Sequence, residues 1–244
     1  AANADRRFFS REEFIGAMFG TATAPDGHGF AAPDGERWYS VSPVPCLRLI
    51  ALDTCDEPGP VPGMPYAEGC ISEWQMEFLQ KELDAAAARG ERVIVATHHP
   101  SNSLEVLYGS AVGPEEFRTL LNAYPNVVVH LAGHRHINRV VERGGYLEIE
   151  TCSTIDVPQE ARILELWEDE TDGSTVVSYR MFSELGDEVP PLGDDPLKQL
   201  RLNARMLAGS PVGDSTTRRP LSDPNPAGTP ADRSGAIRLP NRGT

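Results

Sequence analysis

Two short apolar runs in this sequence are each followed at once by a pair of histidines. Residues 127–132 lead into Gly-His-Arg-His at 133–136, and residues 92–97 lead into His-His-Pro at 98–100. Short apolar runs bounded by glycine or proline are typical of buried strands. Either histidine pair alone would more simply be two loop residues. Two pairs, both placed directly after strands, predict imidazoles gathered at one edge of a sheet, where they could bind a transition metal.

The rest of the pattern predicts an α/β fold. A helix from Ser72 to about Arg89, followed by Gly90, separates two strand candidates and so forms a β-α-β unit. A second helix is expected to begin at Pro114, and Ser10 begins a shorter one with a capping box. After the second apolar run the pattern changes to consecutive strands, which suits two packed mixed sheets with helices outside. The strand candidates are residues 37–41, 47–52, 92–97, 127–132, 137–141, 146–150, 162–167 and 175–182.

Length and charge limit what the chain can do. At 244 residues it suits one domain, or one domain and a tail. The net charge of −14 argues against a protein that binds nucleic acid or anionic membranes through non-specific charge. No apolar run approaches the roughly 20 residues of a membrane span, and no signal peptide is visible. An extracytoplasmic location would need such a leader in a missing N-terminal segment, so localisation stays open.

The four cysteines are not spaced as a structural zinc site, because none forms a Cys-x-x-Cys pair. Cys55 and Cys70 flank a segment rich in proline and glycine and could be joined by a disulfide. The simpler alternative is two separate thiols. The sequence leaves this choice open.

Three segments occur in an order that is known from one enzyme family. Leu-Asp-Thr at 52–54 ends a strand, His-x-Pro at 98–100 follows a second strand, and Gly-His-x-His at 133–136 follows a third. Residues 69–72 open the helix that comes after the first segment. Together they resemble the calcineurin-like metallophosphoesterases over about residues 46–182. The resemblance implies a four-layer α-β-β-α sandwich of two mixed sheets, and phosphate-ester hydrolysis at a dinuclear metal centre.

The motifs that open the family pattern are absent. Members begin with Asp-x-His after a first strand, then Gly-Asp, then Gly-Asn-His. This chain contains no Asn-His, and its Gly-Asp pairs all lie downstream of the histidine motifs. One Asp-x-His occurs at residues 26–28, but no apolar strand precedes it, and we interpret it as coincidental. Residues 1–186 are therefore predicted to be a partial metallophosphoesterase domain, its C-terminal half, incomplete at the N-terminus.

By resemblance, the histidines are metal ligands. His98 and His134 would bind one ion and His136 would help to bind a second, with iron, manganese or zinc as divalent or trivalent candidates. The substrate would be a phosphate ester of unidentified kind. Asn102 and Arg135 are candidate substrate contacts, the alternatives being a loop-capping asparagine and a solvent-exposed arginine. No catalytic residue is identified, because the histidine that serves the leaving group in the family belongs to the absent Asn-His motif.

Three other residues near the strand ends have simpler expected roles. His99 follows a presumed ligand and would point to the other side of the strand end, so it is expected to pack or to support the site, the alternative being that it also binds the metal. Asp53 is expected to hold the loop after its strand. Asp156 is a weaker candidate for metal binding.

The composition changes after about residue 184. Residues 187–244 are rich in proline and glycine and are predicted to be a tail, in which residues 196–208 could form one helix. Residues 209–244 are polar and poor in aromatic side chains. They are expected to be disordered or loosely attached, because they would bury too little apolar surface to offset the entropy lost on ordering.

Two functions fit these observations. The first is the C-terminal part of a two-metal phosphatase or phosphodiesterase, which by itself would be inactive because ligands are missing. The second is a non-catalytic binding domain of the same fold with a degenerate metal site. The oligomeric state is not predicted.

Overall fold

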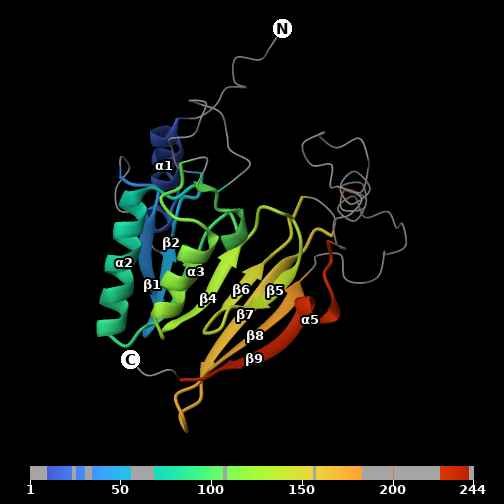
Figure 1. The fold of residues 1–244 in the computed structure, drawn as a ribbon. Coiled ribbons are helices and arrows are strands. Elements are labelled where there is room, and N and C mark those ends of the chain that lie inside the picture. The colour runs from blue at the N-terminus through green and yellow to red at the C-terminus, as the bar shows by residue number, and fades with distance from the viewer. Residues whose placement is uncertain are drawn as a thin grey trace.

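A computed structural model describes residues 10–23, 26–30, 35–55, 69–106, 109–155, 158–182, 200 and 226–241. Two β-sheets packed face to face form its centre. Helices α2 (Glu73–Ala88) and α3 (Pro114–Ala123) lie on the outer face of the larger sheet (Figure 1). The alternation of strands and helices thus fills the first half of the described chain, and consecutive strands fill the second.

The larger sheet has six strands. In chain order they are β1 (Tyr39–Val44), β2 (Leu47–Ala51), β3 (Arg92–Ala96), β4 (Val127–Ala132), β5 (Arg139–Glu142) and β6 (Leu147–Glu150). In space the order is β1-β2-β3-β4-β6-β5. Strands β2, β3, β4 and β6 run parallel, while β1 and β5 join antiparallel at the two edges. The central strands are covered on both faces, which explains why they appear in the sequence as continuous apolar runs.

The two helices cover the sheet with their apolar sides. Ser72 caps α2 by accepting a hydrogen bond from the Gln75 N–H, as the sequence predicts. Leu79 and Leu83 of α2 and Phe117 and Leu121 of α3 are fully buried against the sheet. Each such side chain contributes about 1.5–3 kcal/mol through the apolar surface removed from water.

The smaller sheet has three antiparallel strands, β7 (Ala161–Glu168), β8 (Thr175–Phe182) and β9 (Ser234–Leu239), in that order. Its inner face packs on the larger sheet, where Val177 and Leu239 meet Ile94, Val128 and Ile149 in one apolar cluster. The two sheets therefore share a core that is separate from the core under the helices.

The predicted fold class is confirmed as mixed α/β, with a six-stranded mixed sheet and a separate three-stranded sheet. Helix α5 (Pro230–Arg233) lies near β5, β8 and β9, where the two sheets meet. Trp167 and Phe182 on the outer face of the smaller sheet are more than half exposed. Within the described ranges, no helix forms the expected fourth layer over that face.

None of the described helices is long and apolar enough to cross a membrane.

The prediction of a loosely attached C-terminal tail is wrong for residues 226–241. Strand β9 pairs with β8 over its whole length, from Ser234 opposite Arg180 to Leu239 opposite Thr175. Composition averaged over 209–244 hides this strand, because only its alternate residues need to be apolar to cover one face of a sheet. The helix predicted at 196–208 lies outside the described residues, apart from Leu200.

The N-terminal segment forms helix α1 (Arg11–Phe19) and the short η1 (Asp26–Gly29). The predicted capping box is confirmed, since the Ser10 N–H donates to Glu13 and the Glu13 N–H donates back to Ser10. Edge-to-face contacts of Phe30 with Phe14 and Tyr39, at centroid distances of 6.5 and 5.1 Å, join this segment to β1.

Leu239→Ala should lower the free energy of unfolding by about 3 kcal/mol, because it removes a side chain that is 5% exposed in the core between the sheets. Urea denaturation measures the change. Ala236→Ser on the exposed side of the same strand is the control and should change stability by less than about 0.5 kcal/mol. Equal effects of the two substitutions would mean that β9 is not docked.

Cys55 and Cys70 should form a disulfide when the protein is treated with oxidised glutathione. Their backbones pair in a parallel β-bridge, which places the two residues side by side. Bridged strands lie about 4.8 Å apart, within the Cα separation that disulfides use. Closing the loop should raise the free energy of unfolding by about 3 kcal/mol in the chain-entropy model. Peptide mapping by non-reducing mass spectrometry decides it, and two alkylated thiols after oxidation would contradict the prediction.

Candidate metal centre

The histidines predicted as metal ligands follow two adjacent parallel strands. β3 and β4 pair with Ala96 opposite Leu131, so both chains leave the sheet at the same edge. Just beyond the strands, the Gly133 N–H donates to the His98 carbonyl at 2.9 Å. His98 and His134 therefore lie close together although α3 and β4 separate them in the sequence.

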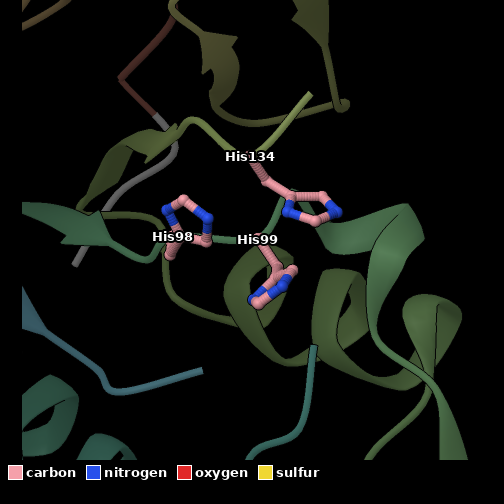
Figure 2. Close-up of side chains that lie close together, drawn as sticks. All are labelled: His98, His99 and His134. Carbon is pink, nitrogen blue, oxygen red and sulfur yellow. The ribbon is translucent and has the colours of Figure 1, made fainter. Parts of the chain in front are cut away.

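Three imidazoles form what we call the histidine cluster: His98, His99 and His134 (Figure 2). Their ring centroids are 4.9 Å apart for His98 and His99, 5.3 Å for His98 and His134, and 4.2 Å for His99 and His134. One ring nitrogen of each lies within 4.8 Å of the others. The expected proximity of His98 and His134 is confirmed. His99 joins them, and His136 is not a member of this group.

The turn after β4 carries unusual backbone conformations. His134 and His136 have φ angles of 65° and 52°, in the left-handed region that non-glycine residues seldom occupy. Such conformations cost of order 1–3 kcal/mol each and cluster at functional sites, where the surrounding structure stabilises them. Here the Arg135 N–H donates to the Gly133 carbonyl at 2.7 Å and closes the turn. This left-handed turn places the His134 ring beside the loop after β3.

The segment Leu-Asp-Thr supports the cluster from β2. The His99 N–H donates to Thr54 Oγ1 at 3.1 Å, and the same oxygen lies 2.8 Å from His99 Nδ1. Both residues are buried. Asp53 accepts the Cys55 N–H at 2.9 Å and pairs with Arg37, so it holds its loop as predicted. Sequence reasoning did not find the role of Thr54, whose only signal was its position after the strand.

Burial and mutual repulsion favour neutral imidazoles in the cluster. Partial desolvation lowers the pKa of His98, and the nearby His136 lowers it further. Burial, His98, His136 and the Arg135 guanidinium together lower the pKa of His134 to about 4. An imidazole must be neutral to bind a metal. At neutral pH these two side chains are therefore ready to act as ligands.

The two candidate substrate contacts differ in their surroundings. Arg135 donates through Nε to Glu150 Oε2 at 2.7 Å and through Nη2 to the other oxygen, and Glu150 is 1% exposed. This pairing fixes the turn between His134 and His136. Asn102 is exposed in the short helix η2 (Ser101–Ser103), next to the loop of His98 and His99. Substrate binding by either residue stays a prediction.

Two weaker candidates for metal binding, His28 and Asp156, do not belong to the histidine cluster. His28 is exposed, has a φ of 57°, and its Nε2 lies 2.8 Å from Thr21 Oγ1, which ties it to the N-terminal segment. It is not a member of the metal-binding group found among the described residues. Asp156 lies outside the residues that the structure describes.

A buried carboxylate lies behind the cluster. Glu148 in β6 is 1% exposed and accepts hydrogen bonds from the Ser101 N–H at 3.2 Å and from Arg143 at 2.6 Å, while His130 Nδ1 lies 3.1 Å away. Burial raises the pKa of Glu148, but these partners outweigh burial and hold the pKa well below 4.5. Sequence reasoning missed both Glu148 and His130, although each is a polar residue within an apolar run.

Glu148→Gln should destabilise the protein by about 3 kcal/mol at pH 7, because it removes one partner of a buried ion pair. The folded-state pKa of Glu148 lies below the usual 4.5, so the carboxylate stabilises the fold above that pH and loses this effect as the pH falls. The loss in unfolding free energy caused by Glu148→Gln, measured by urea denaturation, should therefore be smaller at pH 4 than at pH 7.

The control is Glu115→Gln, because Glu115 has 86% side-chain exposure and pairs with Arg118 at the surface. It should change stability by less than about 0.5 kcal/mol at either pH. A Glu148→Gln effect of the same size at both pH values would contradict the assignment of an ionised carboxylate.

Comparison with known proteins gives structural matches only. No protein-family model and no curated protein sequence matches the chain. A dimetal phosphatase from Danio rerio matches 57% of this chain and 56% of its own, with 18% identity and a TM-score of 0.42. A candidate 5'-nucleotidase from Staphylococcus aureus matches 72% of this chain and 34% of its own, with 15% identity and a TM-score of 0.40. The chain thus spans little more than half of one and about a third of the other.

Proposed function

We propose that this chain supplies histidine ligands to a metal centre that hydrolyses phosphate esters, as in the calcineurin-like metallophosphoesterases that it resembles. The supporting observation is the histidine cluster itself. Segments with the His-x-Pro and Gly-His-x-His patterns, far apart in sequence, bring three imidazoles together at the carboxyl ends of adjacent parallel strands. In open α/β sheets that end of the strands is where ligands bind.

The donor set fits one transition-metal ion. Iron, manganese and zinc accept imidazole nitrogen, and three nitrogens within 4.8 Å of one another need only small side-chain rotations to reach one ion at about 2.0–2.1 Å. His98 and His134 would hold this ion, with His99 as a third ligand. When bound, the ion would supply positive charge to a phosphate oxygen and lower the pKa of a water molecule.

A second ion needs ligands from outside this group. Among the described residues the group contains no carboxylate, and two cations held close together without an intervening anion repel each other strongly. In the proposed two-metal centre, His136 would contribute to the second ion. Bridging carboxylates would come from a segment with the Asp-x-His, Gly-Asp and Gly-Asn-His motifs.

The chain's own residues would position the substrate and the ligands. Neutral His98 and His134 leave their ring nitrogens available, and Glu150 holds the Arg135 side chain beside them. Asn102 is exposed next to the same loop and could donate to a phosphate oxygen.

A non-catalytic metal-binding domain of the same fold is the alternative. The absence of a carboxylate from the histidine cluster, within the described residues, favours it. The two functions predict different results when the absent ligands are supplied, because turnover would be restored in an enzyme and not in a binding domain.

This chain should bind about one Zn²⁺ or Mn²⁺ ion and hydrolyse aryl phosphate mono- and diesters slowly or not at all, because the cluster provides ligands for one ion. Metal analysis after dialysis and a chromogenic phosphate-ester assay measure both. Supplying a segment with the three missing motifs should add the second ion and activity if the chain belongs to an enzyme. Metal binding without restored activity would favour the binding domain.

His134→Ala should abolish most metal binding, since it removes one ligand of the cluster. His28→Ala is the matched control, because His28 is exposed and bonded to Thr21, and it should leave the bound metal unchanged. Metal loss in His28→Ala but not in His134→Ala would reject the cluster and make residues 26–28 the true Asp-x-His motif.

A further inference from the structure

His130 is a buried imidazole that the proposed metal chemistry does not use. It lies in the middle of β4, is 0% exposed, and its ring packs edge-on against Phe117 of α3 at a centroid distance of 5.4 Å. Nδ1 lies 3.1 Å from Glu148 Oε2, and Nε2 lies 2.8 Å from Thr97 Oγ1. Both ring nitrogens therefore have polar partners, as burial of a polar side chain in an apolar strand requires.

The hydroxyl of Thr97 determines whether His130 Nε2 carries a proton. Thr97 Oγ1 lies 2.6 Å from the main-chain carbonyl oxygen of His99. A carbonyl oxygen only accepts, so the single hydroxyl proton of Thr97 points to His99. The Thr97 oxygen must then accept a hydrogen bond from His130, and Nε2 carries a proton.

The surroundings of Glu148 determine whether His130 Nδ1 carries a proton. Oε2 also accepts the Ser101 N–H, and Oε1 accepts two bonds from Arg143. These donors favour an ionised carboxylate, which can only accept, so Nδ1 also carries a proton. Arg118 of α3, which donates to Ser101 Oγ at 3.1 Å, and Tyr146 beside β6 are further charged or titratable groups that the described residues place near this pair. The hydrogen bonds thus assign an imidazolium to His130.

This ion pair anchors the loop that carries two of the cluster's imidazoles. The Thr97 hydroxyl binds the His99 carbonyl on one side, and Glu148 binds the Ser101 N–H on the other. His98 lies between Thr97 and His99, next to the first attachment, and its own carbonyl accepts the Gly133 N–H. The main chain is therefore held at His99 by the Thr97 hydroxyl and at Ser101 by the Glu148 carboxylate. His130 contacts both of these groups.

We propose that His130 is the positioning residue of the histidine cluster: an imidazolium paired with Glu148, it orients the Thr97 hydroxyl and so fixes the main chain that places the imidazoles of His98 and His99 opposite His134. This inference rests on the proposed metal centre and extends it to groups that do not touch the ion. Loss of such outer partners typically weakens metal binding 10–100-fold.

The test compares Thr97→Val with Thr97→Ser. Valine has nearly the shape of threonine but lacks the hydroxyl, whereas serine keeps it. Thr97→Val should weaken Co²⁺ binding to the chain at least tenfold and change the absorption spectrum of bound Co²⁺, and Thr97→Ser should restore both toward those of the unaltered chain. Thr119→Val, at an exposed position of α3, is the matched control and should bind Co²⁺ as the unaltered chain does.

A second measurement does not depend on metal. In ¹⁵N-labelled chain at pH 7, both ring nitrogens of His130 should show a bonded hydrogen, and Thr97→Val should shift the Nε2–H signal together with the ring signals of His98 and His99. Equal Co²⁺ affinity of Thr97→Val and Thr97→Ser, or a single ring proton on His130, would overturn the proposal. If the unaltered chain binds no Co²⁺, the metal centre fails, and the ring signals still decide the positioning role.

Discussion

The parallel pairing of β3 with β4 is the interaction on which the candidate site depends. It places the ends of both strands at one edge of the larger sheet, so that His98 and His134 emerge side by side. The pairing is itself stabilised by apolar burial on both faces, under α2 and α3 on one side and against the smaller sheet on the other. A metal centre at this edge would therefore rest on strands that are buried on both faces.

Strand β6, next to β4, supplies the charges that fix the two histidine loops. Glu148 binds the loop after β3 through the Ser101 N–H, and Glu150 binds the turn after β4 through Arg135. The two carboxylates are two residues apart, so they lie on the same face of the strand. Both are 1% exposed, and buried carboxylates of this kind are stable only with charged or hydrogen-bonded partners. The site's geometry is thus set by two buried carboxylates, one of which holds its loop through the Ser101 N–H and the other through Arg135.

The C-terminal strand shows the limit of reasoning from average composition. Residues 209–244 are polar overall, yet Ile237 and Leu239 face the core between the sheets and β9 completes the smaller sheet. A strand at a sheet edge needs apolar residues on one face only, and its backbone hydrogen bonds to β8 do not depend on residue type. A docked strand of six residues is therefore invisible in an average over 36 residues, but the alternation itself was present in the sequence.

The sequence by itself determined the central strands, the capped helices and the order of the histidine motifs, because apolar periodicity, capping residues and glycine turns act over a few neighbouring residues. It also placed His98 and His134 at strand ends. Only the tertiary structure decided that His99 joins them, and that Thr54 and the pair of His130 with Glu148 support them. Those contacts join residues far apart in the chain, and their existence depends on the strand order of the sheet, which no local pattern specifies.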